Sequence, residues 1–145
     1  MAKPIPEIFD EINADPKAIE KYKGNAALRM IFEYAFDPAK KFILPEGEPP
    51  YKPAVEPMGM TETNLNVECK KFHKLFVEQS LKPIKRESLF IGLIEHIHPT
   101  EAAVLIAVKD QKLQKVYPKI TWKLVSDAGI IPAPPEKVKK ESKST

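Results

Sequence analysis

The sequence predicts an all-α fold, a compact bundle of about six to seven short helices with one long proline-rich loop. A length of 145 residues fits a single domain. Through most of the chain, apolar residues recur at the three- and four-residue spacing of an amphipathic helix. Six of the 15 prolines fall within residues 37–60, where they remove main-chain donors and exclude a regular helix or a central strand. We therefore expect one helical domain over residues 1–135, with a loop over 37–60.

Three helices are expected before the loop. The first has one apolar side, formed by Ile5, Ile8, Phe9 and Ile12. A brief second helix should have Asp15 as its N-cap and Pro16 at its first position, and Gly24 should end it in a left-handed conformation. The third helix, within residues 25–37, is expected to pack against the core through Leu28, Ile31, Phe32, Ala35 and Phe36.

The loop and the elements after it complete the predicted bundle. The loop should be held to the surface by its own apolar side chains, Phe42, Ile43, Leu44 and Tyr51. Residues 61–80 predict an amphipathic helix with an apolar face of Leu65, Cys69, Phe72 and Phe76. Two core helices follow, one over 85–97 and one around an apolar run from Ala102 to Val108. Thr121 should cap a last helix that Gly129 ends. Residues 136–145 predict a disordered basic tail.

Enzymatic chemistry is not expected from this sequence. It contains no Gly-x-Ser-x-Gly elbow and no glycine loop for phosphate, and the single thiol, Cys69, lies on an apolar stripe. Cys69 and His73 have a spacing that would let them share a metal, but nothing supplies the remaining ligands of a tetrahedral site. Glu95 and Glu101 are expected to be solvated at a helix junction. We therefore expect no metal and no cofactor.

The same sequence features give expectations about the cellular setting. No apolar run approaches the roughly 18 residues that span a bilayer, so no membrane partner is expected. A lone cysteine cannot close an intramolecular disulfide and is typical of a reducing cytoplasm.

Basic residues gather at helix ends and turns. The net charge of +3 is small, so attraction to an anionic partner must be local. Turns bring main-chain N–H groups and long cationic side chains together, which suits contact with phosphates; solvated lysines without a partner are the alternative. Tyr117 and Trp122 are candidates for stacking on bases, although a core role is favoured for Trp122. The candidate nucleic-acid-binding residues are Lys85, Arg86, Lys109, Lys112, Lys115, Lys119 and Lys123.

Residues 83–131 carry a resemblance to a known family. An apolar helix over 85–97 is followed by Glu101-Ala102, by a Lys112-Leu113 turn, and by a final helix that leads into "GIIPAPP". This order resembles the closing helices of the amino-terminal DNA-binding domain of ATP-dependent DNA ligases, and "IFDEIN…NAALRMIFEYAFDP" is similar to its opening helices. The resemblance implies sequence-independent contact with the phosphates of duplex or nicked DNA. The Lys-x-Asp-Gly nucleophile of ligases is absent, so the resemblance implies DNA binding without catalysis.

A second resemblance gives a possible origin. The stretches "PIPEIFDEIN", "LPEGEPPYKP" and "KRESLFIGLIEHIHPTEAAVLIAVKD" look like segments of small proteins from tailed phages of the T-even type, including those that infect cyanobacteria. This resemblance implies an origin in a phage, and thus the cytoplasm of an infected bacterial host, but no activity. Together with the DNA-binding hypothesis, this origin predicts an accessory role in phage replication, repair or packaging, with a phage replication protein or a host protein as a possible further partner.

The proline-rich segment supports an alternative function. Extended proline segments are already ordered before binding, and they therefore bind partners at low entropic cost. The chain would then be a protein-interaction adaptor or a host-takeover factor, with lysines that only keep it in solution. Its partner-binding residues would be Pro45, Pro49, Pro50, Tyr51 and Pro53.

Overall fold

The structure, a computed structural model, describes residues 3–57, 59–78 and 81–132. Within these ranges every regular element is a helix and there is no strand, which confirms the all-α prediction. The α-helices are α1 (Ile5–Ala14), α2 (Ala26–Phe36), α3 (Leu65–Glu68), α4 (Pro83–His96), α5 (Pro99–Lys109), α6 (Leu113–Val116) and α7 (Trp122–Asp127). Shorter helical segments are η1 (Pro16–Tyr22), η2 (Pro38–Lys40), η3 (Cys69–Lys71) and the π-helical η4 (His73–Val77). The predicted tail over 136–145 lies outside the described residues.

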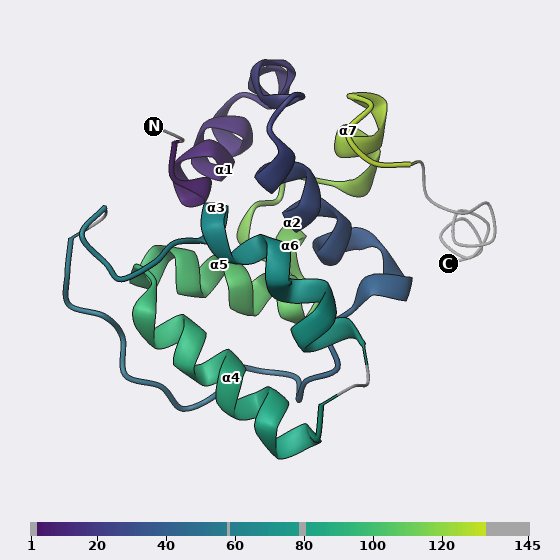
Figure 1. Ribbon diagram of the computed structural model, residues 1–145. Coiled ribbons are helices and arrows are strands. Elements are labelled where there is room, and N and C mark those ends of the chain that lie inside the picture. The colour runs from purple at the N-terminus through teal and green to yellow at the C-terminus, as the bar shows by residue number, and fades with distance from the viewer. Residues whose placement is uncertain (1–2, 58, 79–80, 133–145) are drawn as a thin grey trace.

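Helix α5 lies at the centre of the fold, in contact with α1, α2, α4 and α6 (Figure 1). Its run from Ala102 to Val108 is apolar on every side, and Val104, Leu105 and Val108 are at most 1% exposed. A helix without a polar face is stable only when other elements cover every side of it. The prediction that the run from Ala102 to Val108 forms a core helix is therefore confirmed.

Two predictions about local helix geometry differ from the structure. Residues 16–22 form a 3-10 segment, and the Asp15 side chain accepts a hydrogen bond from Lys17 N as the predicted cap. Gly24 is not left-handed, because Asn25 begins α2 directly after it and caps that helix by accepting from Leu28 N. At the other end of the chain, Gly129 does adopt the left-handed conformation, with φ of 81°.

The predicted helix over 61–80 is divided into three segments. Asn64 caps the short α3, a 3-10 turn follows, and η4 ends where Glu78 N donates to His73 O, five residues back. The change in helical pitch leaves the predicted apolar face intact. Its four residues are all fully buried: Leu65, Cys69, Phe72 and Phe76.

The long loop is held against the helices, as expected from its apolar residues. After η2, the described part of the chain has no further regular element before α3, and the loop runs past α4 before it returns to the body (Figure 1). Phe42 is 2% exposed, and its ring lies 5.0 Å from that of Phe76 and 5.6 Å from that of Phe72. Leu44 and Tyr51 are partly buried against the core, whereas Ile43 is 36% exposed. Phe42 therefore contributes most of the apolar attachment.

Candidate nucleic-acid interface

The segment between α5 and α7 holds three of the six predicted phosphate-binding lysines, Lys112, Lys115 and Lys119, and we call residues 110–121 the basic turn. Lys112 N donates to Ala107 O at 2.8 Å and ends α5. The Leu113 side chain of α6 is buried, and Tyr117 is also buried, with its ring 5.3 Å from that of Phe9. These contacts fold the basic turn back onto the core, while Lys112, Lys115 and Lys119 stay exposed.

Two side chains from distant parts of the chain fix the basic turn in place. Gln111 has a φ of 53°, a conformation that non-glycine residues rarely adopt. Its side-chain amide donates to Asp37 O at 2.7 Å and to Tyr34 O at 3.2 Å, at the end of α2. Near the other end of the turn, Lys119 N donates to the side-chain oxygen of Asn13 at 2.9 Å. The turn is therefore ordered before any ligand is bound.

Four of the predicted residues present cations on or beside this turn. Lys115 and Lys119 are exposed and have no ion pair among the described residues. Lys112 is also exposed, but its Nζ lies 3.2 Å from a Glu46 carboxylate oxygen. Lys123 on α7 pairs with Asp127 at 2.8 Å, and this hydrogen bond raises the pKa of Lys123. Lys115 and Lys119 are thus the two cations of this group that are available without breaking an ion pair.

Two predicted phosphate-binding residues are instead part of the interior. Arg86 is 4% exposed, and its guanidinium donates to Ile43 O at 3.2 Å and to Leu81 O at 2.8 Å. Lys109 is 1% exposed, and its Nζ donates to Pro45 O at 2.6 Å and pairs with Asp110. Because main-chain oxygens occupy these cations away from solvent, we remove Arg86 and Lys109 from the set of phosphate contacts.

The predicted cations lie on different parts of the molecule. Arg86 and Lys109 bind oxygens of residues 43 and 45, so the start of α4 and the end of α5 meet at the same stretch of loop. The exposed Lys85 lies on the first turn of α4, at this end of the molecule. Lys119, in contrast, is held beside α1 through Asn13. The basic turn is therefore the part of the predicted set that forms a defined surface.

Neither aromatic residue of this region is available for stacking on bases. Tyr117 is 8% exposed within the core. The Trp122 ring is stacked on that of Phe36 with centroids 6.4 Å apart, and its Nε1 donates to Pro132 O at 3.0 Å. This arrangement agrees with the core role favoured for Trp122.

The residues of the alternative, protein-binding prediction lie along a strap, which we define as residues 43–52. Pro45 and Pro50 are exposed, as is Pro53 just beyond the strap, while Pro49 and Tyr51 are half-buried. A cavity of about 360 Å³ separates part of the strap from α4. A second, of about 400 Å³, lies where the loop passes the end of α4. The strap therefore presents both exposed prolines and a groove.

The structure also gives the surroundings of the other residues considered for chemistry, a possible metal site, the Cys69 thiol and the Glu101 carboxyl. In the described ranges, no group of three or more His, Cys, Asp or Glu residues is placed to hold a metal ion. Cys69 is fully buried, which raises the pKa of its thiol. Glu101, expected at a solvated helix end, is 0% exposed, and its carboxylate accepts from Leu65 N at 3.1 Å. None of the described helices is long and apolar enough to cross a bilayer.

Sequence reasoning missed the residues that hold the basic turn in place, and it also missed the residue that occupies one of its cations in an ion pair. Gln111 and Asn13 act through main-chain atoms 74 and 106 residues away in the chain, and Glu46 reaches Lys112 across 66 residues. Periodicity and capping rules describe neighbours within about one helical turn. The one local signal for this arrangement was the polar sequence directly after the apolar run of α5. Such a sequence is also typical of a solvated turn, so it did not indicate the long-range contacts.

Comparison with known proteins identifies a family but no activity. Residues 12–115 match the model of a family of unknown function, DUF6433. No curated protein and no solved structure matches the chain. The likeness to ligase domains and to phage proteins therefore stays a prediction.

Proposed function

We propose that this chain, which belongs to the DUF6433 family of unknown function, binds duplex or nicked DNA without sequence specificity through its basic turn. The observation that carries the proposal is that Lys115 and Lys119 are exposed, and without an ion pair to any described residue, on a turn that is fixed at both ends. In keeping with its resemblance to phage proteins, the activity would serve phage replication, repair or packaging.

The physical basis is counterion release from the DNA backbone. A cation that contacts a phosphate displaces condensed counterions, and affinity then falls steeply with salt. A turn that is already ordered loses little conformational entropy on binding. Lys112 joins the contact only when a phosphate replaces Glu46 as its partner, and Lys85 is a more distant contributor at the start of α4. The surface offers no base-reading aromatic group, so it supports recognition of shape and charge rather than of sequence.

Fluorescence anisotropy tests the proposal directly. The full chain would be titrated onto intact, nicked and single-stranded DNA of one sequence at about 50 to 200 mM salt, the range where phosphate-driven affinity changes by orders of magnitude. The test variant replaces Lys115 and Lys119 with Gln. The control variant replaces Lys70 and Lys74 with Gln. These two lysines are also exposed and have no ion pair in the described structure, but they lie on η3 and η4 and not on the basic turn. Both variants lose the same net charge.

The expected result is specific to the basic turn. The test variant should bind both intact and nicked duplex more weakly, and the slope of log affinity against log salt should fall by about one unit for each lost phosphate contact. The control should keep most of the affinity and the slope. Equal loss in both variants would indicate a nonspecific charge effect, and absence of duplex binding at the lowest salt would reject the proposal. Tighter binding to nicked DNA would assign the role to repair.

A further inference from the structure

A groove between the strap and α4 carries an inference that goes beyond DNA binding and does not depend on it. The groove, of about 360 Å³, lies on the outer side of the residues that attach the strap. Its lining combines apolar side chains with carboxylates. The apolar part includes Leu44, Phe90 and Ile91, and the carboxylates are those of Glu46, Glu48 and Glu87. We call this feature the acidic groove.

The acidic groove is built into the fold, because both of its walls are fixed. One wall is α4. The other is the strap, which is attached through main-chain atoms at several points: Pro45 O accepts from Lys109, Gly47 N donates to Asp110 at 3.0 Å, and Lys52 N donates to Glu95 at 2.9 Å. Since these contacts lie on either side of residues 48–50, the strap cannot close onto α4 without breaking them.

The charge of the groove is left uncompensated by the protein itself. Glu48 and Glu87 are exposed and have no ion pair within the described residues, whereas Glu46 is shared with Lys112. The one cation of the lining, Lys109, is already paired with Asp110. Carboxylates beside an apolar wall favour a cation with an aliphatic stem, because the stem covers the apolar surface while the head group meets the carboxylates.

We propose that the acidic groove binds an extended basic segment of a partner protein, with an arginine or lysine side chain between the exposed carboxylates of Glu48 and Glu87 and its aliphatic stem on the apolar wall. This assignment differs from docking through exposed prolines, because the prolines here form a wall of the site. A nucleic acid does not fit the groove, since phosphates would face carboxylates.

The proposal can be tested by NMR titration of the full chain, labelled with ¹⁵N, at low salt. The probe is the acetylated and amidated peptide Leu-Arg-Leu-Arg-Leu, and the matched control peptide has Gln in place of each Arg. The arginine peptide should shift the amide signals of Gly47, Glu48 and Ile91, and the Gln peptide should leave them in place. Shifts confined to other residues, or no shift at millimolar peptide, would overturn the proposal.

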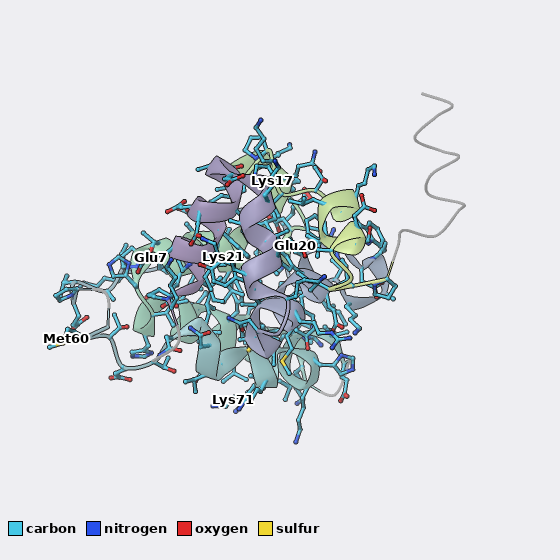
Figure 2. All side chains as sticks on the ribbon, turned by 90° about the horizontal axis from the view of Figure 1, so that it is seen from above. Glu7, Lys17, Glu20, Lys21, Met60 and Lys71 are labelled. Carbon is cyan, nitrogen blue, oxygen red and sulfur yellow. The ribbon has the colours of Figure 1, made fainter. Side chains whose placement is uncertain are left out.

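Matched variants of the chain separate the groove from general charge. Exchanging Glu48 and Glu87 for Gln should weaken peptide binding by about tenfold, taking about threefold for each exposed charge pair. The control exchanges Glu7 and Glu20, exposed acids on α1 and η1 (Figure 2). Equal weakening in the two variants would overturn the assignment. DNA binding of the E48Q/E87Q variant should be retained, so a failure of the groove proposal and a failure of the DNA proposal are distinguishable.

Discussion

The Nζ atom of Lys109 lies 2.6 Å from the carbonyl oxygen of Pro45, at a side chain that is only 1% exposed. The adjacent Asp110 neutralises this buried charge and also accepts from Gly47 N. The end of α5 and the strap are thus held together by one compact polar cluster. Since an ion taken out of water needs both a counter-charge and hydrogen bonds, each member of the cluster depends on the others.

Replacing Lys109 with Met should destabilise the protein by about 3 to 5 kcal/mol, the usual effect of removing one partner of a buried ion pair. The change would leave Pro45 O without its donor and Asp110 without its counter-charge. Urea denaturation gives the free energy of unfolding, and the exposed Lys115→Met, expected to change it by about 0.5 kcal/mol or less, is the control. A loss in K109M below about 1 kcal/mol would mean that water replaces the ammonium group easily.

Gln111 should respond differently to Ala and to Gly. Both changes remove the amide hydrogen bonds to α2, but Ala also keeps a side chain in the left-handed conformation with φ of 53°. We expect Gln111→Ala to be less stable than Gln111→Gly by about 1 kcal/mol. Thermal unfolding of both variants measures this difference. Equal stability would show that the turn relaxes to a negative φ once the amide is removed.

Phe42→Ala should lower the free energy of unfolding by about 3 to 5 kcal/mol, because the ring is buried and a cavity would remain. Its ring contacts those of Phe72, Phe76 and Phe90, so the loss extends from the segment of η3 and η4 to α4. Val55→Ala, in the same loop but 92% exposed, serves as the comparison and should change stability little. If both variants unfold at the same denaturant concentration, Phe42 does not attach the loop.

Glu101 should make the protein less stable as the pH rises above the ordinary range of a Glu carboxyl. Burial raises the pKa of Glu101, and its second carboxylate oxygen has no hydrogen-bond partner among the described residues. The native state then holds this proton more tightly than the unfolded state does. The contribution to stability is complete below the unfolded pKa of about 4.3, declines as pH rises to the native pKa, and is constant above it.

The comparison of wild type with Glu101→Gln isolates that contribution. Urea unfolding at several pH values from 4 upward should show the wild type losing stability relative to E101Q through the window between the two pKa values. Parallel curves over the whole range would show that the buried carboxyl has an unshifted pKa.

The sequence predicts the helices that have strong periodicity and misses what depends on contacts between distant segments. Helix α5 was expected from its apolar run, and the left-handed Gly129 from its place after a capped helix. The spacing of apolar residues does not reveal the π-helical turn at His73–Val77. The apolar face from Leu65 to Phe76 would be buried in a regular α-helix and is also buried with the π-helical turn. Arg86 and Lys109 were placed on the surface because charged side chains usually are.

The correction of those two residues shows why the candidate site was only partly predictable. Their acceptors in the strap are main-chain oxygens 43 and 64 residues away, and every residue type supplies such an oxygen. No pattern of side chains could therefore indicate the pairing. Lys115 and Lys119, whose role requires only exposure on a turn, lie where a local argument puts them.

The attachment of the strap through its own main chain has a consequence for how this protein can diversify. Arg86 and Lys109 bind the carbonyl groups of residues 43 and 45, and those groups are present whatever side chains stand there. The side chains that donate to the main chain of the strap thus belong to α4 and α5, and these hydrogen bonds do not depend on the strap's own outward side chains. New side chains at positions 48 and 50 can alter which molecule is recognised without altering these main-chain contacts of the strap.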